Sequence, residues 1–221
     1  MRILAALLLL AAAAPAAAQP PSGILEALAR DFPIDHAALR ASLAGKPPEE
    51  ARRLAYAGID AFLRAHRDAI LAAPGPALVA IEARQGALLR ALEKQDVRLC
   101  AVVGDRGLFS DEALARPAPT GLDDYGAALV AAAKAGAGGG PAPAPATRED
   151  VLAWLAAVDR AEPGVPVRAM LSDPALRAAS SPDHLCRGAA AMHEAAASLP
   201  APQAERLSRT LLRSVIGSVA E

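Results

Sequence analysis

Apolar side chains recur every three or four residues along most of this chain, the spacing that gathers them on one side of an α-helix. Over residues 47–73 the apolar stripe consists of Ile59, Phe62, Leu63, His66 and Ile70. Over residues 77–103 a second stripe consists of Leu78, Ile81, Leu88, Leu92, Leu99 and Val102, with Gln85 among them. The two stripes predict two long amphipathic helices, and the break Pro74-Gly75-Pro76 between them favours a reversal of the chain.

Two helix starts in the second half of the chain are marked by capping signals. Thr120 and Asp123 have the spacing of a capping box, ahead of a helix that we expect to run to about Lys134. Thr147 and Asp150 repeat that spacing ahead of another apolar run. Both pairs therefore predict a helix whose first backbone N–H groups are satisfied by a side chain.

The two ends of the chain also read as helical. Ser181 and Pro182 are typical of the cap and the first residue of a helix, here continuing through Leu199. Residues 24–30 and 35–44 predict two short helices near the start. The last predicted helix carries a broad apolar face of Leu207, Leu211, Leu212, Val215, Ile216 and Val219. No run shows the sustained alternation of apolar and polar residues that is typical of a strand.

Polar, glycine-rich and proline-rich stretches interrupt this helical pattern. Asp96 is expected to end or kink the second long helix, and residues 104–121 read as a surface loop with a short helix after Ser110. The stretches "EPGVP" and "SDPAL" predict short turns. Residues 135–147, "AGAGGGPAPAPAT", are typical of a flexible spacer and form the best candidate boundary.

The pattern as a whole predicts an all-α protein. We expect an irregular bundle of about six to eight amphipathic helices, stapled by one disulfide. The spacer divides the chain into an N-terminal helical part, residues 19–134, and a C-terminal helical part, residues 148–221. We expect the second part to pack on the first as one domain.

The first eighteen residues read as a secretory signal peptide rather than as part of the fold. Arg2 precedes an apolar run over residues 3–14, and Ala16 and Ala18 have the small-residue spacing of a cleavage site before Gln19. The run is shorter than the roughly 20 apolar residues of a membrane span. We therefore expect an exported, soluble mature chain, most simply a bacterial periplasmic one, with no transmembrane span after cleavage.

Charge and aromatic content narrow the classes of partner. The chain has 23 Lys and Arg against 24 Asp and Glu, a formal net charge of −1. That balance does not favour nucleic acid or an anionic membrane surface. Aromatic residues make up 3% of the chain, too few for a platform on which bases or sugars stack.

Cys100 and Cys186 are the only cysteines of the chain. An exported protein with an even, minimal number of cysteines most often oxidises them to a disulfide, which here would span the spacer and tie the two helical parts together. Two other states stay open at this point. The cysteines could be buried free thiols, or Cys186 could have a redox, metal or nucleophilic role.

The stretch "SPDHLCRGAAAMHEAA" sets Cys186 between His184 and His193. Residues seven apart lie on one side of a helix but about 10 Å apart along its axis, so Cys186 and His193 are not expected to pair directly. A distant imidazole from His36 or His66 is the remaining candidate for a Cys-His pair. His66 itself lies on an apolar stripe and is more simply a hydrogen-bonded residue of the core or its boundary.

Other polar residues give weaker signals. Gln85 inside an apolar stripe needs hydrogen-bond partners, or else reaches water from the edge of the stripe. Asp123 and Asp124 suit the start of a helix better than an acid–base pair. The chain has none of the short motifs typical of zinc sites, phosphate loops or serine hydrolases. We therefore assign no catalytic, cofactor-binding or metal-binding residue, and no cofactor.

These observations favour a non-enzymatic function. We expect a binding or scaffold module of the cell envelope that presents a helical groove to another envelope protein or a peptide. Two alternatives remain. One is a small hydrolase that uses Cys186 and a distant histidine, which an alkylatable thiol would support. The other is a carrier whose helices open around an apolar ligand, which an internal cavity would support.

Overall fold

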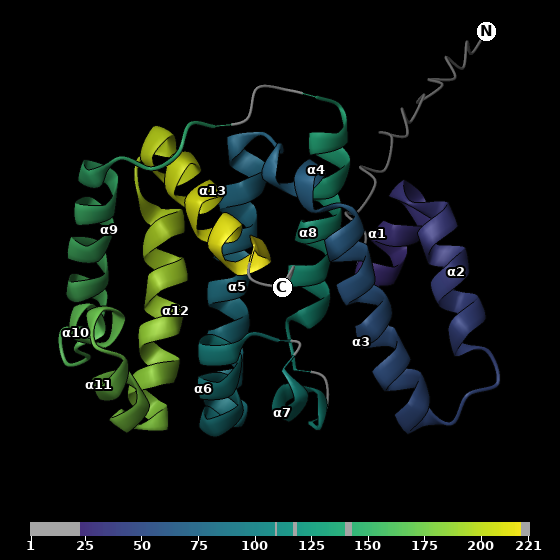
Figure 1. The fold of residues 1–221 in the computed structure, drawn as a ribbon, viewed down its shortest axis with the longest axis horizontal. Helices are drawn as coiled ribbons and strands as arrows, with labels where there is room; N and C mark the ends of the chain where they lie inside the picture. Colours follow the sequence, from purple (N-terminus) through teal and green to yellow (C-terminus); the bar gives the residue numbers. More distant parts are fainter. Residues whose placement is uncertain (1–22, 109, 117–118, 140–142, 218–221) are drawn as a thin grey trace, which may run out of the picture.

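The computed structural model describes residues 23–108, 110–116, 119–139 and 143–217 (Figure 1). The predicted signal peptide lies outside these residues, as does Val219, and the side chains of Val215 and Ile216 are likewise not described. All regular structure in the described part is helical, as expected. The helices are α1 (Ile24–Asp31), α2 (Pro33–Leu43), α3 (Pro48–Ala65), α4 (Arg67–Leu71), α5 (Gly75–Gln95), α6 (Val97–Arg106), α7 (Asp111–Leu114), α8 (Leu122–Ala137), α9 (Arg148–Ala161), α10 (Val167–Ser172), α11 (Pro174–Ala179), α12 (Pro182–Ser198) and α13 (Ala201–Gly217).

The helices are shorter and more numerous than the expected six to eight, because each long apolar stripe is divided. The first is broken at His66, whose backbone leaves the helical region between α3 and α4. The second is broken at Asp96, which adopts an extended backbone between α5 and α6. The Asp96 side chain accepts hydrogen bonds from the backbone N–H groups of Arg98 and Leu99 and so starts a new helix. Because the apolar stripes continue across both breaks, periodicity alone does not reveal where the helices are broken.

Two of the three predicted caps are confirmed. Thr147 and Asp150 form a reciprocal capping box at the start of α9, and the Ser181 hydroxyl accepts from the His184 backbone N–H at the start of α12. Thr120 does not cap α8. Its hydroxyl accepts instead from the side-chain amide of Gln95, and α8 starts after Gly121.

One proline-containing stretch and the spacer differ from expectation. The stretch "EPGVP" forms a turn between α9 and α10, as expected, whereas "SDPAL" spans the end of α10 and the start of α11, which Asp173 caps. Helix α8 runs on to Ala137, past Lys134 and into the glycine-rich stretch. Gly136 there is buried against α4, where only a residue without a side chain fits beside the Ala69 carbonyl.

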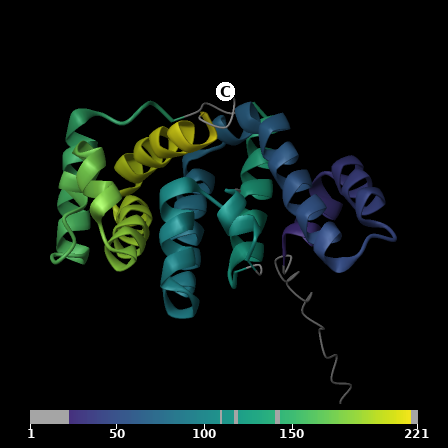
Figure 2. The ribbon, with the colours of Figure 1, turned by 60° about the horizontal axis from the view of Figure 1, so that its bottom comes forward.

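The C-terminal helices pack directly on the N-terminal ones. Helix α12 lies along α5 and α6, and α13 crosses α5 towards α4 (Figures 1 and 2). Helix α8 lies between α5 on one side and α1 and α4 on the other. One apolar cluster joins residues from α1 to α8 with α12 and α13, and a second joins α9, α10, α12 and α13. Helices α12 and α13 belong to both clusters and link them.

Within the described residues, no helix combines the length and the apolar character needed to cross a membrane.

Candidate functional site

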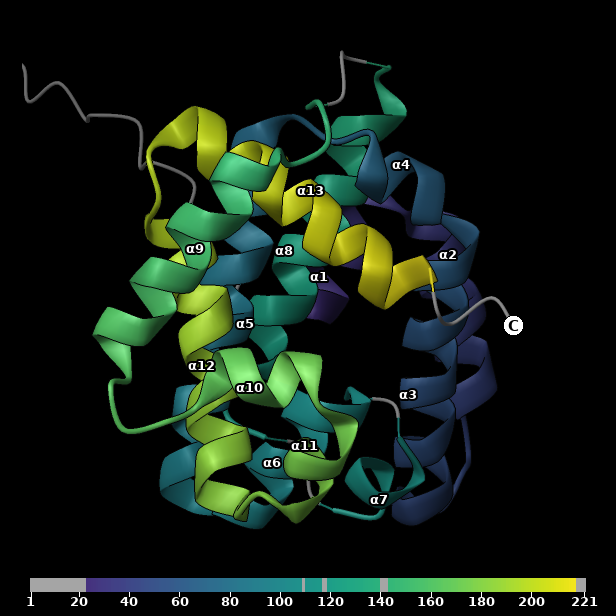
Figure 3. The ribbon, with the colours of Figure 1, turned by 60° about the vertical axis from the view of Figure 1, so that its left-hand side comes forward.

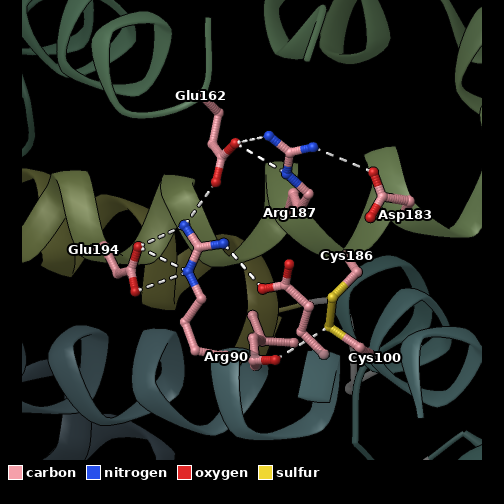
Figure 4. Close-up of polar contacts among 9 residues, drawn as sticks. Arg90, Cys100, Glu162, Asp183, Cys186, Arg187 and Glu194 are labelled. Atoms are coloured by element: carbon pink, nitrogen blue, oxygen red, sulfur yellow. Dashed lines mark hydrogen bonds and ion pairs between the residues drawn. A yellow bond between two sulfur atoms is a disulfide. The ribbon is translucent and has the colours of Figure 1, made fainter. Parts of the chain in front are cut away.

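The expected disulfide joins α6 to α12. The sulfurs of Cys100 and Cys186 are 2.00 Å apart, and both residues are fully buried (Figure 4). Both cysteines belong to the apolar core, and neither keeps a free thiol. The bond therefore serves as a structural cross-link in this state, and it leaves no thiolate for a nucleophilic or metal-binding role.

A cluster of charged residues lies beside the disulfide (Figure 4). Arg90 of α5 donates to Glu194 of α12 at 2.9 Å and to Glu162, the residue that ends α9, at 2.9 Å. Arg187 of α12 also donates to Glu162, at 3.0 Å. Burial alone would raise the pKa of Glu162, but the hydrogen bonds from Arg187 and Arg90 outweigh it and lower that pKa. Each charge has a partner, so the cluster fastens α5, α9 and α12 together.

A cavity of about 520 Å³ lies between the N-terminal and C-terminal helices. Its lining comes from α3, α5, α6, α8 and the helices from α9 to α13, which surround the centre of Figure 3. Most of the wall is apolar, formed by Leu63, Leu88, Val103, Leu108, Leu129, Trp154, Leu171, Met192 and Leu211. The indole N–H of Trp154 donates to the backbone carbonyl of Met192 at 2.8 Å, which holds the ring in place in this wall.

Besides His193, five charged residues line the cavity, and each has an ion-pair partner. Arg64 pairs with Asp60 on α3. Arg177 of α11 pairs with Asp105 of α6 at 2.6 Å. Arg106 pairs with Asp105 at 3.7 Å and with Glu112, outside the lining, at 3.2 Å. The paired charges leave the cavity without a strong excess of either sign, and the second pair attaches α11 to the wall.

A buried carboxylate and an imidazole meet at this cavity. Glu82 of α5 is fully buried, and its Oε2 lies 2.6 Å from Nδ1 of His193 on α12. An ionised carboxylate can only accept, so Nδ1 donates and the ring orientation is fixed. His193 lines the cavity with its side chain 13% exposed. Its Nε2 has no hydrogen-bond partner within the described part of the chain, and neither has Oε1 of Glu82.

Two more polar groups face the same space. Tyr125 of α8 lines the cavity, and burial, followed by the negative charge of Glu82, raises the pKa of its phenol. The phenol therefore keeps its proton at neutral pH and can donate a hydrogen bond. Gln85 also lines the cavity. We call His193, Tyr125 and Gln85, three uncharged or titratable polar residues of the lining, the polar floor.

The remaining histidines and acids lie elsewhere. Nε2 of His66 is 3.4 Å from Oδ2 of Asp35, and its ring packs against Phe32 and Phe62, as expected for a residue at the edge of the core. His36 and His184 do not line the cavity.

Asp123 and Asp124 lie exposed in the first turn of α8, where helix starts favour acids.

Sequence reasoning did not identify Glu82. A signal was present, because Glu82 follows Leu78 by four residues and precedes Leu89 by seven, which places it on the apolar stripe of α5 beside Gln85. Its partner His193 is separated from it by 111 residues, so nothing local links the two. No cluster of three or more metal-ligating side chains occurs among the residues that the structure describes.

No known protein family matches this chain, and neither the curated proteins nor the solved structures compared with it gave a significant match.

Proposed function

We propose that this chain is an exported binding protein that holds a small, largely apolar ligand in the cavity between its two helical parts. The observation that carries the proposal is the cavity itself. Its volume of about 520 Å³ falls within the range of known small-molecule sites. Its composition, apolar walls with a few convergent polar groups, is also the usual one for such sites.

The rigidity of the cavity wall supports the same proposal. The Cys100–Cys186 bond, the Arg90 cluster and the Trp154 hydrogen bond all cross between helices that line the cavity or lie behind it. A site that is held open by cross-links does not have to be rebuilt when the ligand enters, which lowers the cost of binding.

The other two functions expected from the sequence are less well supported. A hydrolase that uses Cys186 needs a free thiol, and the disulfide consumes it. A module that binds an envelope protein or peptide would need an apolar groove on its surface. The large apolar side chains that are exposed in the described part of the chain lie on five different helices and are Leu25, Ile34, Leu152, Leu171 and Leu176.

The direct test is native mass spectrometry of the oxidised chain, purified without detergent from the compartment in which it accumulates. We expect an adduct of ligand mass that is lost on denaturation. The delipidated chain should then bind the neutral apolar dye N-phenylnaphthylamine, followed through the fluorescence of Trp154, the single tryptophan.

Matched variants place the binding in the cavity. Leu211→Gln puts a polar amide into the wall and should weaken dye binding about tenfold or more, since it removes apolar contact and leaves an amide unpaired. Leu152→Gln is the control, because Leu152 is half-exposed on α9 and does not line the cavity. The absence of both an adduct and dye binding, or equal losses in the two variants, would overturn the proposal.

A further inference from the structure

We propose that the polar floor selects ligands with an uncharged hydroxyl group, seated against Nε2 of His193. This rests on the proposed function, since it identifies the head group of the ligand that the cavity would hold. The ligand class is then a neutral amphiphile: an alcohol, or a lipid with a free hydroxyl, whose apolar part lies against the leucine-rich wall.

The first step of the argument is the fixed imidazole. The 2.6 Å hydrogen bond to Glu82 occupies Nδ1 and leaves Nε2 as the ring's one remaining polar atom. That atom has no partner within the described residues, although the ring is mostly buried at the cavity. Nε2 is not fully buried, unlike the unpaired Oε1 of Glu82, so a ligand or a water in the cavity can reach this nitrogen and complete it.

The second step concerns charge. Glu82 and His193 carry a total charge of zero when the imidazole is protonated and of −1 when it is neutral. A carboxylate ligand would add a further negative charge next to the fully buried carboxylate of Glu82, at a high electrostatic cost. An ammonium ligand would lose its hydration and would be repelled by a protonated ring. A hydroxyl brings no charge and avoids both costs.

The third step is the match of donors and acceptors. A hydroxyl donates one hydrogen bond and accepts others, so it pairs with Nε2 whether that nitrogen accepts or donates. The hydroxyl can form further hydrogen bonds with the phenol of Tyr125 or the amide of Gln85, which line the same cavity. An ether of the same shape accepts but cannot donate and would leave part of the floor unsatisfied.

The experiment compares four probes of one chain length on the oxidised wild-type protein: decan-1-ol, methyl nonyl ether, decanoate and decylammonium. Binding is followed by Trp154 fluorescence and by displacement of N-phenylnaphthylamine, each below the aggregation concentration of the probe. We expect the alcohol to bind about tenfold more tightly than the ether, because one well-made hydrogen bond supplies about that factor. The alcohol should also bind more tightly than either ion.

Two variants test whether His193 causes the preference for a hydroxyl group. His193→Phe keeps a flat ring without the nitrogen and should reduce the affinity for the alcohol to that for the ether, with little change for the ether itself. His184→Phe, on the same helix but away from the cavity, should leave the ratio unchanged. Thermal unfolding checks that each variant folds, and His193→Gln serves if the phenylalanine variant does not.

The outcomes separate the two proposals. Equal binding of alcohol and ether by the wild-type chain, or tighter binding of decanoate or decylammonium, would overturn the hydroxyl preference and leave the apolar cavity standing. Failure of all four probes and of the dye to bind would overturn the proposed function itself. The wild-type comparison needs no variant, so a folding defect in His193→Phe cannot hide either result.

Discussion

Asp150 and Glu82 are both almost completely buried carboxylates, and their hydrogen bonds distinguish their roles. Asp150 of α9 accepts two hydrogen bonds from Arg206 of α13, at 2.8 and 2.7 Å, and one from the backbone of Thr147. Glu82 has one partner, His193, and one oxygen without any in the described part of the chain. A fully satisfied carboxylate stabilises the fold, whereas an incompletely satisfied one beside a cavity suits a binding site.

Removal of the Asp150 side chain should therefore destabilise the protein markedly. Asp150→Ala loses one of the two hydrogen bonds of the capping box and leaves Arg206 without its partner, and we expect a loss of about 2–3 kcal/mol in the free energy of unfolding, measured with urea. Asp159→Ala on the same helix removes an exposed pair with Arg168 and should cost less than about 1 kcal/mol. Equal losses in the two variants would contradict this distinction.

The same carboxylate gives a pH dependence of known sign. The hydrogen bonds from Arg206 hold the pKa of the Asp150 carboxyl well below its usual range, while burial alone would raise that pKa. An acid whose pKa is lower in the folded than in the unfolded state contributes its full stabilisation of the fold at pH values above its unfolded-state pKa. That stabilisation is lost as the pH falls from there through the folded-state pKa. The difference in unfolding free energy between wild type and Asp150→Asn should be constant from pH 7 to about 5 and shrink below about 4. A difference in unfolding free energy that grows as the pH falls would contradict the lowered pKa of Asp150.

At the scale of elements, close helix contacts depend on small residues that the apolar pattern does not mark. Gly136 lets α8 approach the backbone of α4, and a Cβ there would overlap the carbonyl oxygen of Ala69. We expect Gly136→Ala to destabilise by about 1–3 kcal/mol despite the better helix propensity of alanine. Gly138→Ala, at the exposed end of α8, should change stability by less than about 1 kcal/mol, as thermal unfolding would show. A neutral Gly136→Ala would mean that α8 and α4 are not in contact as described.

The element boundaries show which local signals can be read from a sequence. Thr147 and Ser181 cap the helices that they were expected to cap, because a cap depends on residues within one turn. Asp96 was expected to end or kink a helix, and the structure places it as the cap of a new one. Thr120 fails as a cap because Gln95, a residue of another helix, binds its hydroxyl. Such competition from a distant segment cannot be read locally.

For the whole molecule, the disulfide is a covalent link between the helical parts, with a sequence separation of 86. Cross-linking a loop of that size should contribute about 4–5 kcal/mol, mainly by restricting the unfolded chain. We expect the double variant Cys100→Ala/Cys186→Ala to unfold at a correspondingly lower urea concentration. Reductant should shift the wild type towards that variant and leave the variant itself unchanged. An unchanged wild type under full reduction would contradict a stabilising bond.

Export is the second prediction at this scale, and it rests on the sequence alone. Expressed with its own first residues in a Gram-negative host, the chain should appear in the periplasm with Gln19 as its first residue, checked by intact mass and N-terminal sequencing. Arg160→Lys, an exposed residue of α9, is a control that should not affect processing. A cytoplasmic, full-length product would contradict the proposal and would also remove the oxidising environment that favours the disulfide.

The sequence by itself determined that this protein is helical, where several helices begin, and which residues were free to form a disulfide. These properties depend on neighbours within a few residues, through the 3.6-residue period and side-chain caps, or on the cysteine count. Only the tertiary structure decided that Glu82 meets His193 and that a cavity of about 520 Å³ opens beside them. Packing among many helices decides which residues far apart in the sequence come into contact. A leucine in a cavity wall also has the same sequence pattern as a leucine in a filled core, so the pattern does not reveal a cavity.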